Sequence, residues 1–131
     1  MSFDAATQLA QTNIQAGDDV PPLAITVHST ERSLRVEVSG ELDLNTVPLL
    51  QQALETALAP LPERLFLDFR HLEFIDSAGL ALLVDLHPRF RGHHHPSSLT
   101  LLVPVEGQVR EVLELSHFGQ FFHIEYGDQG T

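Results

Sequence analysis

Hydrophobic and polar residues alternate along the first half of the chain with two different periods. Residues 34–39 alternate strictly, which is the pattern of a half-buried strand, and the apolar run at residues 24–27 predicts another strand. Because only a short turn separates the two, we expect an antiparallel hairpin. From Thr46 to Leu58 apolar residues recur at helical spacing, with Thr46 placed to cap the start and Pro48 in the first turn. The chain is therefore expected to begin with a hairpin and an amphipathic helix.

The second half of the chain continues this alternation of strands and helices. A short apolar strand at residues 65–69 is followed by a helix from Ser77 to about His87, where Pro88 ends or kinks it. A strand is predicted at residues 99–103, followed by a third helix that starts after Pro104 and has Val109, Val112, Leu113 and Ser116 on one face. Residues 121–126 are predicted to form a last strand or strand–helix edge. This order predicts one α/β domain: a mixed β-sheet with an N-terminal antiparallel hairpin and then parallel strands, packed with about three to four helices through right-handed crossovers.

The two ends of the chain lack this patterning. Residues 1–20 are polar, small and weakly patterned, and we interpret them as a flexible arm with room for a short helix at residues 5–14. A pair of prolines then precedes the first strand, and residues 127–131 are interpreted as a frayed tail. The expected domain spans residues 21–126.

Composition excludes several classes of function. The 131 residues contain no cysteine, which excludes a disulfide scaffold and thiolate metal sites. A formal net charge of −11 repels nucleic acid and anionic membrane surfaces. No run approaches the roughly 18 apolar residues of a membrane-spanning helix, and the chain starts without the basic lead of a secretory signal. We expect a cytoplasmic protein that contacts neither nucleic acid nor membrane. A protein partner fits this charge better than either, but charge alone favours the simpler explanation that the surplus acid keeps the domain soluble.

Few residues have the spacing of a catalytic or metal site. The common phosphate-binding motifs are absent, and Ile75 stands where the hydrolase elbow around Ser77 would need glycine. His93, His94 and His95 are consecutive in a predicted loop, where neighbouring side chains point in opposite directions. We therefore expect a solvated loop there and no cofactor or metal.

The most informative segment joins the strand at residues 65–69 to the following helix. It delivers Asp76 and Ser77 to the first turn, where unpaired amides favour negative charge. Gly79 costs up to about 1 kcal/mol relative to alanine in a helix, so it requires a reason: close approach of another surface, or packing against the sheet. Taken alone, a capping aspartate and a packed glycine explain the pattern. Three apolar residues of this helix are assigned to the core: Leu80, Leu83 and Val84.

Two separated motifs resemble those of one protein family. Residues 38–43, VSGELD, and residues 74–80, FIDSAGL, resemble the signatures of the STAS domain family in order and spacing. The resemblance extends from about Leu23 to Tyr126, and within the family it is greatest to bacterial anti-sigma factor antagonists. It implies a phosphoprotein that regulates transcription and is not an enzyme.

The resemblance also implies how such a protein works. In these antagonists the serine after the aspartate, here Ser77, is phosphorylated by a partner that is both an anti-sigma factor and a serine kinase. The unphosphorylated form binds that kinase and frees the sigma factor, and a PP2C-type phosphatase resets the switch. Ala78 replaces the second hydroxyl residue of some relatives, so no second phosphate is expected there.

The resemblance places the partner-binding surface around this serine. Its expected members are Asp76, Ser77, Ala78, Gly79, Gly40, Glu41 and Asp43. Asp76 would cap the helix and help to present the hydroxyl, and Gly79 would permit close approach of the partner. For Asp43, contact with the partner and capping of the next helix are equal alternatives.

Two other functions stay open at this point. The same fold could be a scaffold component of a larger stress-signalling assembly. Ser77 could also be the nucleophile of a serine hydrolase, although Ile75 and the lack of a convincing histidine–aspartate pair argue against it.

Overall fold

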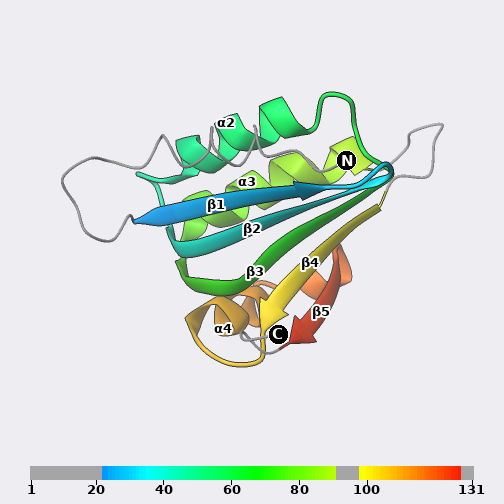
Figure 1. The fold of residues 1–131 in the computed structure, drawn as a ribbon. Helices are drawn as coiled ribbons and strands as arrows, with labels where there is room; N and C mark the ends of the chain where they lie inside the picture. Colours follow the sequence, from blue (N-terminus) through cyan, green and yellow to red (C-terminus); the bar gives the residue numbers. More distant parts are fainter. Residues whose placement is uncertain (1–21, 91–97, 128–131) are drawn as a thin grey trace.

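In residues 22–90 and 98–127, which this computed structural model describes, five strands form one mixed β-sheet (Figure 1). The strands are β1 (Leu23–Ser29), β2 (Ser33–Leu42), β3 (Arg64–Ile75), β4 (Ser98–Pro104) and β5 (His123–Gly127). They lie in the order β1-β2-β3-β4-β5; β1 is antiparallel to β2, and the later pairs are parallel. The predicted mixed sheet with an N-terminal hairpin is confirmed.

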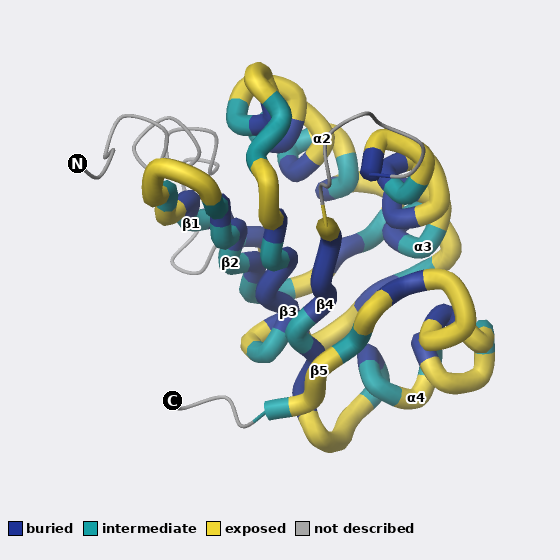
Figure 2. Tube along the Cα trace, turned by 90° about the vertical axis from the view of Figure 1, so that its right-hand side faces the viewer, coloured by how far each residue is buried: buried dark blue, intermediate teal, exposed yellow. Residues whose placement is uncertain are grey.

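Each parallel connection passes through a helix. The helices are α2 (Val47–Ala57), α3 (Ser77–Leu86) and α4 (Gln108–Leu115), with short 3-10 helices η1 (His87–Phe90) and η2 (Phe118–Gln120) after α3 and α4. Figure 2 shows α2, α3 and α4 on one side of the sheet, which is the arrangement that successive right-handed crossovers in one direction produce. The parallel strands β2, β3 and β4 therefore end at the same end of the sheet, where the following helices begin.

The hydrophobic core lies between the sheet and these helices. Burial alternates along β1 and β2, as the strict alternation of residues 34–39 predicts. The buried side chains of the first three strands include Leu23, Ile25, Val27, Leu34, Val36, Val38, Leu65, Leu67 and Phe69. The helices complete the core with Leu50, Leu54, Leu82, Leu83, Leu86, Val109 and Leu113. Burial of this apolar surface provides the main driving force for folding.

Two strands and one helix residue differ from their predictions. β3 continues to Ile75 because its parallel pairing with β2 persists through two register shifts, so residues 70–75 join the sheet instead of forming a loop. The last strand begins at His123, and Phe122 before it is buried in the core. Val84 was assigned to the core but is 56% exposed, because it lies on the outer face of α3.

Some predictions fall outside the part of the chain that is described. These are the arm at residues 1–20, the histidines at positions 93–95 and the tail from residue 128 onward. Gly127, expected in the tail, is the last residue of β5. Among the described helices, none has both the length and the apolar character needed to cross a membrane.

Candidate functional site

Ser77 is the first residue of α3 and is exposed at the edge of the sheet. The preceding strand, β3, ends at Ile75, and Asp76 keeps an extended backbone with φ −115° and ψ −170°. An extended residue with a short polar side chain is the usual start of a helix. The sequence thus places an accessible hydroxyl in the first turn of α3, as predicted.

Asp76 caps α3 and also holds the neighbouring loop. The N–H groups of Ala78 and Gly79 donate to its Oδ1 at 2.9 and 3.2 Å, and the N–H of Leu44 donates to its Oδ2 at 3.2 Å. Its own N–H donates to the carbonyl of Leu42 at 3.1 Å. The predicted cap is confirmed, and the same carboxylate fixes the loop before α2 beside Ser77.

That loop is stabilised by its own side chains. Oδ1 of Asp43 accepts the N–H groups of Asn45 and Thr46 at 2.9 and 3.1 Å. Oγ1 of Thr46, which is buried, accepts the N–H of Asp43 at 2.9 Å and donates to the carbonyl of Glu41 at 2.8 Å. Thr46 was expected to cap α2 with its side chain, but it makes no such hydrogen bond. Asp43 therefore has a structural role in organising the turn that leads into α2.

Both glycines of the expected surface are explained by the chain itself. A Cβ on Gly79 would lie 2.6 Å from Cγ1 of Ile75 and 3.1 Å from Cδ2 of Leu42. Gly79 is buried, so the surface that approaches it closely is its own domain and not a partner, which corrects the expected role. Gly40 has φ +101°, and a Cβ there would lie 2.3 Å from the carbonyl oxygen of Pro22. Both positions require glycine for packing.

The accessible part of the site is smaller and more apolar than expected. Ser77 and Glu41 are exposed, and Ala78 is half-buried. Two side chains that were not among the expected members of the surface join them: Leu44 is 74% exposed and Phe74 is 37% exposed. Leu44 could have been noticed in the sequence, because it is a large apolar residue between the polar residues of a loop. The surface around Ser77 thus combines a hydroxyl, acidic groups and exposed apolar side chains.

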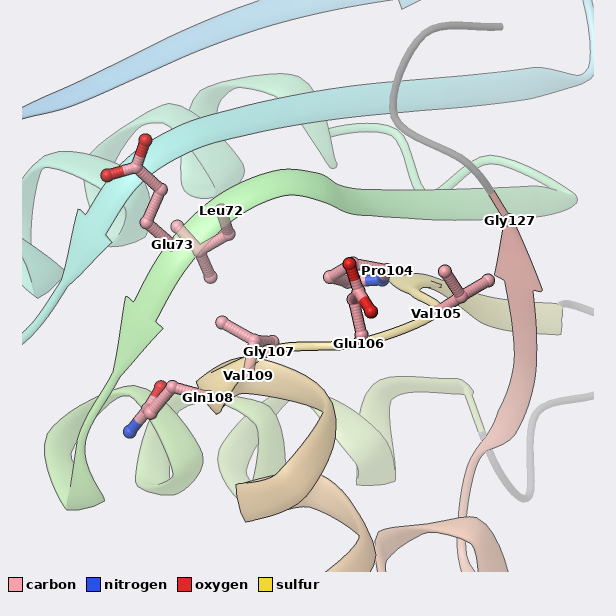
Figure 3. A pocket seen from close by; sticks show the side chains of 9 residues that line it. All are labelled: Leu72, Glu73, Pro104, Val105, Glu106, Gly107, Gln108, Val109 and Gly127. Atoms are coloured by element: carbon pink, nitrogen blue, oxygen red, sulfur yellow. The ribbon is translucent and has the colours of Figure 1, made fainter.

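A groove next to the site is held in place by Gln108. Its amide group pairs with both backbone groups of Ile75, donating to the carbonyl and accepting the N–H at 2.9 Å each. This pairing ties the start of α4 to the end of β3. The groove has a volume of about 480 Å³, and Figure 3 shows the carboxylates of Glu73 and Glu106 pointing in different directions. Across the described ranges no group of three potential ligands could hold a metal ion.

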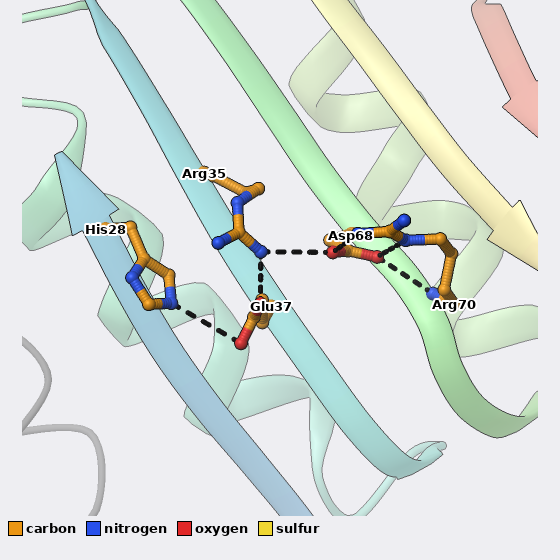
Figure 4. Close-up of polar contacts among 5 residues, drawn as sticks. All are labelled: His28, Arg35, Glu37, Asp68 and Arg70. Carbon is orange, nitrogen blue, oxygen red and sulfur yellow. Dashed lines mark hydrogen bonds and ion pairs between the residues drawn. The ribbon is translucent and has the colours of Figure 1, made fainter. Parts of the chain in front are cut away.

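The helix-free side of the sheet carries a separate ion network (Figure 4). Asp68, which is 1% exposed, accepts hydrogen bonds from Arg70 Nε at 2.9 Å, Arg70 Nη2 at 2.8 Å and Arg35 Nη1 at 3.2 Å. Arg35 also binds Glu37, and Nε2 of His28 lies 3.4 Å from Oε1 of Glu37. This network was not predicted; its sign in the sequence is one aspartate, Asp68, within the apolar run of β3.

The network controls the ionisation of its members. Burial raises the pKa of Asp68, but hydrogen bonds from Arg70 and the charges of both arginines outweigh it and hold the pKa below its ordinary value. The pKa of Glu37 is also lowered, since the bonds from Arg35 and His28 outweigh burial. The hydrogen bond to Asp68 raises the pKa of Arg70. Each of these charges is neutralised by a neighbour, so the network is structural.

Comparison with known proteins gives consistent matches. A family model described as "Mlab, STAS domain" matches residues 25–124. A STAS-domain containing protein of Pseudomonas aeruginosa is 29% identical over 93 residues, which cover 71% of this chain and 88% of that protein.

Two solved structures are similar in fold. One is an anti-sigma factor antagonist from Mycobacterium paratuberculosis, with a TM-score of 0.69, 24% identity and coverage of 84% of this chain and 89% of that one. The other is the anti-sigma factor antagonist SpoIIAA in its unphosphorylated form, with a TM-score of 0.65, 22% identity and coverage of 81% and 90%. At these identities the likeness establishes the shared fold.

Proposed function

The chain belongs to the STAS domain family, and from this premise we propose that it is an anti-sigma factor antagonist switched by phosphorylation of Ser77. Its partners are an anti-sigma factor with serine kinase activity and a PP2C-type phosphatase, and through them it regulates transcription. The observation that carries the proposal is the exposed hydroxyl of Ser77 in the first turn of α3, beside the capping carboxylate of Asp76. A kinase can reach this hydroxyl without unfolding the domain.

The electrostatic surroundings explain how one phosphate could end partner binding. A phosphoserine carries about −1.5 to −2 charges at neutral pH. It would stand beside Asp76 and close to the acidic loop that carries Glu41 and Asp43, in a protein whose net charge is −11. Bringing such a group against a partner requires its desolvation. A loss of about 3 kcal/mol weakens binding by roughly two orders of magnitude, which is enough to exchange partners.

A regulatory role is favoured over a serine hydrolase. A hydrolytic serine needs a base within hydrogen-bonding distance, and in the ranges 22–90 and 98–127 no histidine hydrogen bonds to Ser77. The groove beside the site also lacks a histidine among its lining residues. We therefore propose that Ser77 is a substrate of an enzyme and not a nucleophile.

The test is phosphorylation by purified candidate kinases. The full chain is incubated with anti-sigma factor kinases and ATP, and intact mass and site mapping locate the phosphate. We expect a single phosphate on Ser77, none on Ser77→Ala, and wild-type incorporation in Ser98→Ala, which removes another exposed serine. Ser77→Asp should fold normally and bind the kinase about 100-fold more weakly. Incorporation into Ser77→Ala, or unimpaired binding of Ser77→Asp, would contradict the proposal.

A further inference from the structure

The outer face of α3 exposes both apolar and polar side chains, and it is less polar than the outer faces of α2 and α4. Its exposed residues are Ser77, Ala81, Val84 and Asp85. Spacings of four and seven residues place Ser77, Ala81 and Val84 along one stripe of the helix surface. The other two helices expose mainly polar and charged side chains, including Gln51, Gln52, Glu55, Thr56, Glu111 and Glu114. The stripe that begins at Ser77 therefore resembles a contact surface more than a solvated one.

This stripe ends at an apolar cavity. The cavity has a volume of about 220 Å³ and is lined by Val84, His87, Phe118, Phe121 and Phe122. Phe118 and Phe122 are buried and stacked, with ring centroids 5.4 Å apart, and the ring of His87 meets Phe122 edge-on at 5.0 Å. Phe121 and Val84 are 63% and 56% exposed. The cavity thus has a buried aromatic floor and an exposed apolar rim.

A single exposed apolar side chain needs no special explanation, but this arrangement has three aligned features. The cavity is preformed, it has an exposed aromatic rim, and it is continuous with the helix face that carries Ser77. Val84 lies about 10.5 Å along the helix axis from Ser77 at 1.5 Å per residue. A standard protein interface covers about 800 Å² on each partner, so one partner can cover both points.

We propose that this cavity is a second docking point for the anti-sigma factor kinase that acts on Ser77, and that it receives a large apolar side chain of that kinase. The inference rests on the proposed function and deepens it. Buried apolar anchors in well-packed pockets supply much of the binding energy of interfaces. The cavity provides affinity through apolar contact, and the charge state of Ser77 decides whether the partner stays.

The experiment removes the rim of the cavity and leaves Ser77 intact. Phe121→Ala and Val84→Ala truncate exposed side chains, and Leu115→Ala is the matched control because Leu115 is 79% exposed and does not line the cavity. The probes are the purified anti-sigma factor kinases of the phosphorylation test. Calorimetry should show binding weakened about tenfold or more by Phe121→Ala and less by Val84→Ala, with Leu115→Ala unchanged. Phosphorylation of Ser77 should show a raised KM and an unchanged kcat.

The outcomes separate this inference from the proposed function. If both rim variants bind as the wild type does while Ser77→Asp loses binding, the docking point is wrong and the phosphorylation switch stands. If no kinase binds the wild type, both proposals fail. Sedimentation tests a second copy of this chain as the occupant. A wild-type dimer that Phe121→Ala dissociates would overturn the proposal that the cavity receives a different protein. Circular dichroism checks that all three variants are folded.

Discussion

Asp68 and Asp76 belong to the same stretch of chain, but the protein neutralises their charges in different ways. Asp68 lies in β3 on the helix-free side of the sheet and binds two arginine side chains. Asp76 follows the strand and binds three backbone N–H groups, which carry only partial charges. Because its charge is paired with two arginines of the same domain, Asp68 has a structural role. Asp76 is stabilised by backbone dipoles, so Asp76 and the serine beside it can still be contacted by a partner.

The largest expected effect is the loss of the charge at Asp68. Asp68→Ala leaves two guanidinium groups without their buried partner and should lower the free energy of unfolding by about 3 kcal/mol. Asp68→Asn should cost less but still about 2 kcal/mol, because an amide cannot replace the charged acceptor. Urea unfolding measures both, with Asp85→Ala on the exposed face of α3 as the control. Losses below 0.5 kcal/mol (roughly those of a surface substitution) would show that the network does not hold this face.

The next largest effect is expected from acid, which should weaken the stabilisation provided by Asp68 and its ion network. The pKa values of Asp68 and Glu37 are lowered in the folded state, so their contribution is present above the ordinary carboxyl pKa and is lost as the pH falls through the lowered values. The free energy of unfolding should decrease between about pH 5 and pH 2. In Asp68→Asn this decrease should be smaller. An identical pH dependence in both proteins would mean that Asp68 does not couple protonation to folding.

The smallest expected effect concerns Asp76. Asp76→Ala removes a helix cap and should lower the free energy of unfolding by about 1–2 kcal/mol. Asp76→Asn should cost less, roughly 0.5–1 kcal/mol, because the amide oxygen still caps α3 but the NH2 group cannot accept the N–H of Leu44. Asparagine is therefore expected to be less harmful at position 76 than at position 68. Thermal unfolding of the two asparagine variants side by side checks this contrast, and equal losses would remove the distinction.

Local features of the molecule could be predicted from the sequence. The hairpin, the helices and the position of Ser77 after a capping aspartate follow from hydrophobic period and from residue types within a few positions of each other. The family resemblance rested on the same local motifs. Asp43 was also placed correctly before α2, although its two roles could not be separated until its hydrogen bonds to Asn45 and Thr46 were seen.

What the sequence could not provide depends on contacts between distant parts of the chain. The extension of β3 results from pairing with β2, and Gln108 binds Ile75 from another element. Val84 has the composition of a core residue, and only the orientation of α3 exposes it. For Gly79 the sequence left two reasons open, a partner or packing within the domain, and the contacts with Ile75 and with the distant Leu42 select packing.

The cap formed by Asp76 has a consequence for any phosphate added to Ser77. Helix N-termini often cradle phosphate groups with their free amides. Here Oδ1 of Asp76 already occupies the amides of Ala78 and Gly79. These two amides are therefore not free to bind a phosphoryl group on Ser77, and the carboxylate of Asp76 would repel it. The phosphoryl group would have to extend outward, where water or the side chains of another protein must neutralise its charge.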